Sequence, residues 1–208
     1  MCFNAPVSIT TYIVGIIGCI ILLKKKYTPE AAFFLVVIQM QLIEFFLWKN
    51  QSCNSTNIFV TKLGIAVNHM EPVVFWLAIL FFSEKKLPKW INYTMILYIL
   101  AALFYTMNVN NTLCTTVTPE SSPHLYWKWN DMKYKNYFYV FFLFTLIALS
   151  ITGLKYGYHM AIIVLLSFII SYIVYGKYKS TGAMWCFIAA AGPLIIPYFY
   201  KIKLFNLE

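Results

Sequence analysis

The stretch NHMEPVVFW, residues 68–76, places an amide, an imidazole and a carboxylate within four residues and follows them with a proline. It lies inside an apolar run over 58–82, long enough to cross a hydrocarbon layer of about 30 Å at 1.5 Å per residue. An ionised carboxylate at the bilayer centre costs about 2.5–3.5 kcal/mol on insertion scales. The position of Glu71 therefore needs an explanation from the surrounding sequence.

Apolar runs of similar length occupy most of the chain. Of its 208 residues, 61% are hydrophobic and 11% are charged, whereas soluble domains are nearer half apolar and a quarter charged. The alternating segments of a membrane barrel are absent. The sequence predicts an all-α polytopic membrane protein, a single transmembrane domain over residues 1–208 with seven transmembrane helices. The expected spans are 6–23, 31–48, 58–82, 90–107, 137–154, 158–175 and 182–200.

Lysine positions predict the orientation of these spans, because cytoplasmic loops carry an excess of positive charge. With the N-terminus outside, the loops of the first four spans hold six lysines inside and two outside. The second half reverses this bias, with three lysines inside and five outside. Since the first half usually dominates, we expect the N-terminus outside and the C-terminus inside.

The net charge of +9 does not indicate a nucleic-acid partner. All sixteen basic residues are lysines, whereas arginine is the usual residue for bidentate phosphate and guanine contacts. The lysines flank apolar runs, where they anchor spans next to anionic lipid. The expected partner is the lipid bilayer, together with a small solute or ion.

Spans 2 and 3 carry the candidate site. In span 2, Gln41 and Glu44 are three residues apart and share a helix face; in span 3, Asn68 and Glu71 repeat this spacing. The two spans are antiparallel neighbours, so these faces can meet within the bundle. We place a ligand or proton site there and include His69, although an ideal helix turns it about 160° away from Glu71.

A purely structural role is the alternative for this cluster. Polar side chains hydrogen-bond between membrane helices and stabilise them by about 0.6 kcal/mol on average. Pro72 lacks an N–H and leaves the carbonyl of Asn68 without its usual partner, so Glu44 or Gln41 is expected to supply a donor. Two carboxylates exceed what helix association normally needs, so a functional pocket stays open beside the structural role.

The loops on the expected outer side contain two further features. Cys53 and Cys114 both lie there and can form a disulfide if that side is oxidising; a cytosolic exposure would leave them reduced. The segment HLYWKW, residues 124–129, is typical of an aromatic belt at the membrane surface, and a lid over a ligand site is the alternative.

The sequence lacks the residues that several well-known activities of membrane proteins and enzymes require. The last span, 182–200, has no lysine for a retinal, and no cofactor or metal site is expected, since the three histidines do not form a ligand pattern. Motifs of hydrolases and nucleotide-binding proteins are absent. An enzyme would need a nucleophile beside the acidic residues, and none is convincing. Pro193 and Pro197 predict a kink in the last span.

Four short segments carry a resemblance: MCFN at 1–4, QLIEFFLW at 41–48 followed by Cys53, NHMEP at 68–72, and WCF at 185–187. Together they resemble an uncharacterised family of multi-pass membrane proteins from large DNA viruses, with distant bacterial relatives. Those relatives start with M-C-F-S and carry Q-x-x-E-G-x-x-W in the second span. In this family glutamine is more common than glutamate before the proline, so Glu71 is a departure and the resemblance favours Gln41 and Glu44.

The leading interpretation is a small-solute or ion transporter, a channel or a ligand sensor with a polar pocket between spans 2, 3 and 7. An intramembrane lipid-modifying enzyme and a structural protein of a viral or host membrane are the alternatives. A cavity lined by the polar residues of spans 2 and 3 would favour the first of these.

Overall fold

Long apolar helices dominate the structure, a computed structural model that describes residues 4–109, 113–119, 121, 123–131 and 133–201. Six helical segments are long and apolar enough to cross a membrane, and a bent pair of helices makes a seventh if it is counted as one span. The expected all-α polytopic fold is confirmed, and the chain is a multi-pass membrane protein. The first three residues of the MCFN segment lie outside the described residues.

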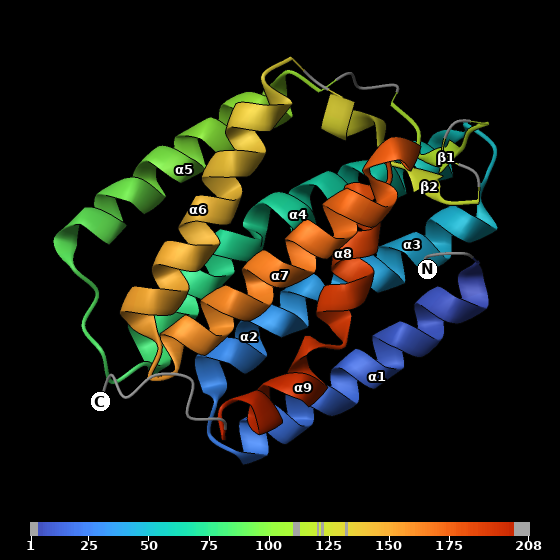
Figure 1. The fold of residues 1–208 in the computed structure, drawn as a ribbon. Helices are drawn as coiled ribbons and strands as arrows, with labels where there is room; N and C mark the ends of the chain where they lie inside the picture. Colours follow the sequence, from blue (N-terminus) through green and yellow to red (C-terminus); the bar gives the residue numbers. More distant parts are fainter. Residues whose placement is uncertain (1–3, 110–112, 120, 122, 132, 202–208) are drawn as a thin grey trace.

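The helices follow the expected order (Figure 1). The spans are α1 (Ala5–Lys24), α2 (Thr28–Val37) continued by α3 (Gln39–Lys49), α4 (Ser55–Phe82), α5 (Lys89–Met107), α6 (Lys135–Gly153), α7 (Gly157–Tyr175), and α8 (Thr181–Ala190) continued by α9 (Gly192–Phe199). The connections contain strands β1 (Thr116–Val117) and β2 (Leu125–Tyr126) and the 3₁₀ helices η1 (Lys128–Asp131) and η2 (Gly176–Tyr178). The second span begins earlier than expected, at Thr28.

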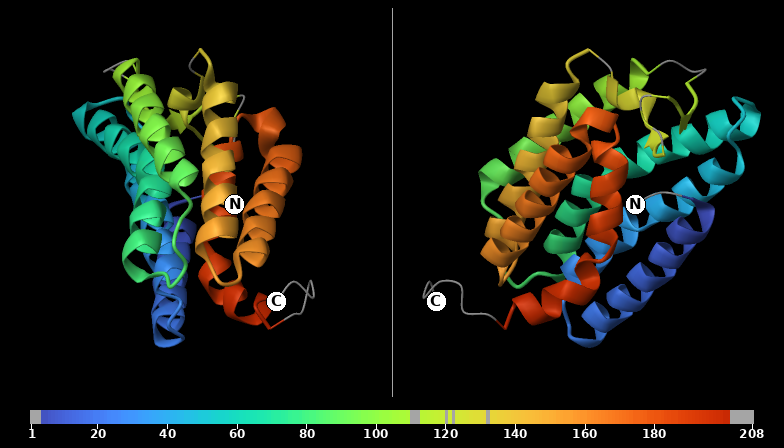
Figure 2. Two further views of the ribbon diagram at one scale, coloured as in Figure 1. Left: turned by 90° about the vertical axis from the view of Figure 1, so that its left-hand side faces the viewer. Right: turned by 45° about the vertical axis from the view of Figure 1, so that its right-hand side comes forward.

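One end of the bundle carries the antiparallel hairpin of β1 and β2, the connection from α3 to α4, and the start of α8 (Figures 1 and 2). We call this the outer end, following the orientation expected from the lysines, and the opposite end the inner end. Helix α4 has 28 residues and is about 42 Å long at 1.5 Å per residue, so it extends beyond a hydrocarbon layer of about 30 Å. Its first turns are therefore available to hold the outer loops.

The last span is bent near its middle, and the second is interrupted at one residue without a sharp bend. The second is interrupted at Ile38, where the side-chain amide of Gln39 donates to the carbonyl of Leu35 at 2.9 Å. The last bends by 56° between α8 and α9, at Ala191, just before Pro193. The expected kink is thus confirmed, whereas the break at Ile38 involves neither proline nor glycine and was not expected.

Both breaks lie against α1, which runs along the edge of the bundle (Figure 2). A Cβ added to Gly15 would lie 2.6 Å from Ile38 Cγ2 and 3.3 Å from the carbonyl oxygen of Ala190. A Cβ on Gly18 would lie 2.7 Å from Pro193. These glycines allow α1 to approach the two broken spans closely, as small residues do between membrane helices.

Two apolar clusters fill the described bundle. The larger joins most spans, and the smaller lies at the outer end, where it combines side chains of α3, α4 and α8 with the loop after α5. In the smaller cluster Trp127 and Trp129 stack with ring centroids 4.7 Å apart and are 2% and 0% exposed. The loop therefore belongs to the folded bundle and covers its outer end.

Candidate functional site

Helix α4 presents its polar residues to different sides. Asn68, His69 and Glu71 are all buried, with exposed fractions between 2% and 4%. Because a helix turns 100° per residue, Asn68 and Glu71 share a face while His69 points away from it. Each side of α4 has different neighbours, and these decide what each side chain can do.

Glu71 borders a cavity of about 70 Å³, which we call the Glu71 cavity. Its walls come from α2, α7, α8 and α9 and are mostly apolar, as at Phe33 and Ile195; Ser167 adds a hydroxyl. The oxygen Oε1 of Glu71 is buried and has no hydrogen-bond partner in the described part of the chain, while the carboxyl group is hydrogen-bonded to Asn68. A water needs only about 10–15 Å³ measured in this way, so this cavity is large enough for water, with Glu71 and Ser167 as polar side chains in its wall.

A second cavity of about 290 Å³, the outer cavity, lies between α6, α7, α8 and the loop after α5. Asn68 lines it, and its oxygen Oδ1 lies 3.5 Å from the hydroxyl of Tyr139, another lining residue. Trp185 borders both cavities. Asn68 and Glu71, one helical turn apart, thus stand between a larger space toward the outer end and a smaller space at membrane depth.

Gln41 and Glu44 are hydrogen-bonded to each other and buried in α3. Both are 0% exposed, and the amide Nε2 of Gln41 donates to Oε2 of Glu44 at 3.2 Å. Glu44 faces the interior, as expected from its cost in lipid. Neither residue lines the Glu71 cavity or the outer cavity. Of the residues expected to form one pocket, Asn68 and Glu71 line the two cavities described here, while Gln41 and Glu44 are bonded to each other in α3.

His69 packs on the opposite side of α4. Its Nδ1 lies 2.8 Å from the hydroxyl of Thr106, and its ring lies 4.9 Å from that of Phe138. The backbone carbonyl of His69 accepts a hydrogen bond from the hydroxyl of Tyr98 at 3.0 Å. A side-chain donor was expected at the carbonyl of Asn68, which Pro72 leaves without its usual partner. The structure shows such a donor at the neighbouring carbonyl, that of His69, and the donor is Tyr98 of α5. His69 is brought into neither cavity.

The outer loops are fastened to α4. Cys53 and Cys114 form a disulfide with their Cα atoms 5.6 Å apart, so the two residues suggested as a pair are joined in the structure. Next to it, the side-chain amide of Asn57 donates to the carbonyl of Thr115 at 2.8 Å, and the hydroxyl of Thr61 lies 3.1 Å from that of Thr115. These bonds fix the loop that carries the two buried tryptophans. The aromatic-belt interpretation of residues 124–129 is wrong for Trp127 and Trp129, since a belt residue would be exposed at the membrane surface.

Sequence reasoning missed a third buried glutamate. Glu30 lies in the first turn of α2, is 4% exposed and accepts a hydrogen bond from the hydroxyl of Tyr200 at 3.0 Å. The Tyr200 ring stacks on that of Tyr156 at 4.6 Å and meets that of Tyr27 edge-on at 5.2 Å. This group, which we call the Glu30 cluster, closes the inner end of the bundle. A start signal, Thr28-Pro29 followed by an acidic residue, could have placed Glu30 inside the helix.

Comparison of the chain with protein-family models, with curated proteins and with solved structures finds no match. Within the described residues, no group of three His, Cys, Asp or Glu side chains is placed to hold a metal ion. The interpretation of the site therefore depends on the geometry of the two cavities.

Proposed function

We propose that this protein is a carrier of a small solute that enters through the outer cavity, with Glu71 as the group that exchanges a proton or cation. The observation that carries the proposal is the Glu71 cavity: a buried carboxyl group with one oxygen lacking a partner in the described residues faces a space that can hold water or an ion. A carboxylate used only for helix packing would be expected to have both oxygens bonded.

The broken spans support this proposal. In many transporters the ligand site lies near the middle of the membrane, where interrupted helices meet. Here the breaks at Ile38 and Ala191 both lie close to α1, and Val37 and Gly192, next to the breaks, line the Glu71 cavity. The cavity thus has walls on α2, α4, α8 and α9, which supports a pocket between spans 2, 3 and 7.

The disulfide supports an oxidising environment at the outer end of the protein. Disulfides persist in oxidising compartments, so the outer end is proposed to face the exterior of a cell or the lumen of the secretory pathway. This agrees with the orientation expected from the lysines of the first four spans. The resemblance of four short segments to membrane proteins of large DNA viruses, an expectation from the sequence, is compatible with such a membrane but supplies no activity.

Proton movement in sealed vesicles tests the proposal. Purified protein is reconstituted into liposomes that contain a pH-sensitive dye, and the outside is acidified. We expect the interior to acidify faster than in protein-free liposomes, and Glu71→Gln to return the rate to that background, because glutamine keeps the shape but cannot exchange a proton. Glu84→Gln is the matched control, since Glu84 is exposed in the loop after α4.

Two outcomes would contradict this function. One is a wild-type rate equal to that of protein-free liposomes over a range of membrane potentials; the other is a Glu71→Gln variant that conducts like the wild type. Glu44→Gln shows whether the buried pair of α3 takes part: a loss of flux would place it on the proton path, and an unchanged flux would make it structural.

A further inference from the structure

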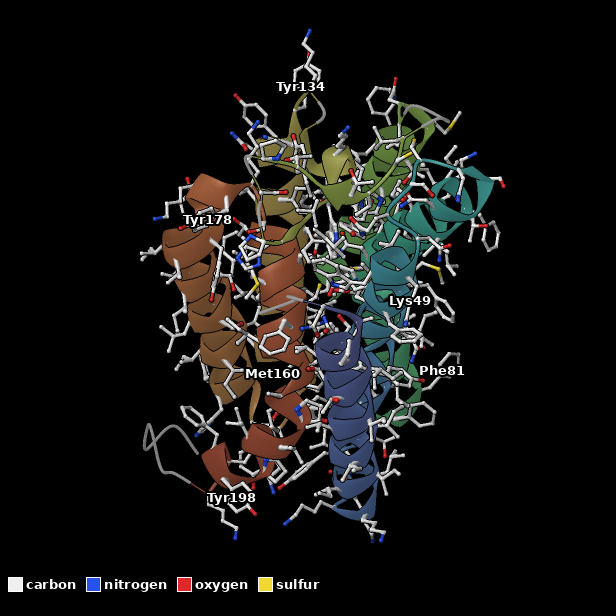
Figure 3. All side chains as sticks on the ribbon, turned by 90° about the vertical axis from the view of Figure 1, so that its right-hand side faces the viewer. Lys49, Phe81, Tyr134, Met160, Tyr178 and Tyr198 are labelled. Carbon is white, nitrogen blue, oxygen red and sulfur yellow. A yellow bond between two sulfur atoms is a disulfide. The ribbon has the colours of Figure 1, made fainter. Side chains whose placement is uncertain are left out.

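The wall of the outer cavity combines positive charge at one end with aromatic surface at the other. Lys135 and Lys179 line it from the start of α6 and the segment before α8. Their neighbours Tyr134 and Tyr178 lie at the same end of the molecule, opposite to Tyr198 (Figure 3). Among the described residues that line this cavity, the two charged side chains are both cations.

Two helix starts add to this positive end. Gly182 lines the cavity and has no side chain, so the first turn of α8 presents its backbone there; Asn136 lines it from the first turn of α6. Neither helix has a side chain bonded to its first N–H groups at the capping residue. The N-terminus of a helix attracts anions through these N–H groups and the helix dipole.

The aromatic end continues toward the membrane. Phe168, Tyr172 and Trp185 line the outer cavity, and Tyr172 is 63% exposed on the outside of α7. Ser167, next in sequence to Phe168, and Trp185 border the Glu71 cavity and are joined by a hydrogen bond of 2.9 Å. The seam between α7 and α8 thus leads from the two lysines to the depth of the hydrocarbon layer.

We propose that the outer cavity binds a single-chain amphiphile with an anionic head, a carboxylate or a phosphate, placed between Lys135 and Lys179 with its chain along Phe168 and Trp185. Lipid tails are as apolar as this wall, so the chain gains little by leaving the bilayer, and the head decides which molecule is bound. That this amphiphile is also the carried solute rests on the function proposed above; the binding itself does not.

Quenching of tryptophan fluorescence tests the site, because Trp127 and Trp185 both line it. The protein is placed in nanodiscs of phosphatidylcholine and titrated with a fatty acid brominated along its chain. A lysine near an anionic head contributes about 1 kcal/mol, so Lys135→Gln with Lys179→Gln should raise the half-quenching concentration about 25-fold. Arginine at both positions should restore binding.

The matched control is Lys133→Gln with Lys177→Gln. It removes the same charge two residues away, from side chains that line neither cavity described here, and should leave the titration within about twofold of the wild type. Equal shifts in the two double variants, or no shift in either, would show that the head is not bound between Lys135 and Lys179 and would overturn the proposal.

Competition identifies the chemistry of the ligand. Lysophosphatidic acid should displace the brominated fatty acid, while lysophosphatidylcholine, whose head has no net charge, and inorganic phosphate should not. Displacement by phosphate alone would make this a site for a free anion, and displacement by lysophosphatidylcholine would make it a site for chains regardless of the head. Specific binding without proton flux would leave this site intact and contradict only the proposed carrier function.

Discussion

Glu30 and Glu71 are both buried in membrane spans, yet their surroundings differ. Glu30 accepts a hydrogen bond from Tyr200, within a cluster of three tyrosine rings that closes the inner end of the bundle. Glu71 has one oxygen without a partner in the described residues and faces a cavity, with a larger cavity one helical turn away. The carboxyl group of Glu30 is thus enclosed by packed side chains, whereas that of Glu71 has empty space beside it.

This difference teaches how to separate structural from functional carboxylates in a membrane bundle. The insertion cost is similar for both, so the presence of a glutamate in a span does not decide its role. The decision lies with what surrounds it: an aromatic donor and packed rings at Glu30, unfilled space at Glu71. The inner end is thereby packed around Glu30, whereas the interior of the bundle keeps a cavity beside Glu71, and four measurements can break or sharpen this contrast.

The largest difference should appear in chemical labelling. A hydrophobic carbodiimide reacts with protonated carboxyl groups that it can reach from the lipid or from a cavity. We expect most molecules to be labelled at Glu71 and few at Glu30, as measured by peptide mass spectrometry after digestion. Glu71→Gln should remove the main label. Equal labelling of the two glutamates would show that the Glu30 cluster is as open as the Glu71 cavity.

Removing the disulfide should loosen the outer end alone. Cys53 and Cys114 are 61 residues apart in sequence, and loss of a native disulfide typically costs about 2–4 kcal/mol. Replacing both by serine should lower the midpoint of thermal unfolding in detergent and expose the loop before α6 to protease. Labelling of Glu71 should increase and that of Glu30 should stay unchanged. A thermal midpoint equal to that of the wild type would mean that Asn57 and Thr61 hold the loop without the disulfide.

Tyr200→Phe should weaken the inner end. It removes the tyrosine donor to Glu30, whose buried carboxyl group keeps the hydrogen bond from its own backbone; losing a donor to a buried charged group costs about 1–3 kcal/mol. Denaturant unfolding in detergent micelles measures the loss. Tyr198→Phe is the control, because Tyr198 is 72% exposed at the same end and should change stability by less than about 0.5 kcal/mol. Equal stability of the two variants would remove the structural role given to the Glu30 cluster.

The smallest effect concerns acidity at the outer loop. Burial lowers the pKa of His124 from its ordinary value of about 6.5, so the unfolded loop binds a proton more readily than the folded loop. The folded loop therefore has its full stability at a pH above about 6.5. This stability decreases as the pH falls from there through the lower pKa of His124 in the folded state. Protease cleavage of the loop should increase on acidification, and His124→Gln should reduce this dependence. If the substitution leaves the pH profile of cleavage unchanged, another titrating group causes the pH dependence.

Much of the fold could be predicted because it follows from runs of apolar residues and from prolines. The spans, the bend before Pro193 and the pairing of Cys53 with Cys114 all rest on local signals or on loop positions. The break at Ile38 has no such signal, since neither proline nor glycine is present there. Glu30 was missed because its helix begins at Thr28, before the apolar run starts.

The candidate site was less accessible to sequence reasoning. Helical spacing correctly placed Asn68 and Glu71 on one face and turned His69 away from it. It could not show that Gln41 and Glu44 bond to each other away from both cavities, because this depends on how α3 is rotated against its neighbours. Cavities arise where side chains from four or five helices fail to fill the space between them, and no local pattern records that.

The small apolar cluster at the outer end also has a consequence for biosynthesis. It packs Leu125, Trp127 and Trp129 against Ala183 and Cys186 of α8. A ribosome makes the chain from its N-terminus, so the tryptophans emerge more than fifty residues before their partners. Until the last span is inserted they have no complete surface to cover, whereas the disulfide needs only residues already made. Oxidation of Cys53 and Cys114 can therefore hold the loop near α4 while the chain is unfinished. Insertion of α8 then completes the apolar cluster at the outer end.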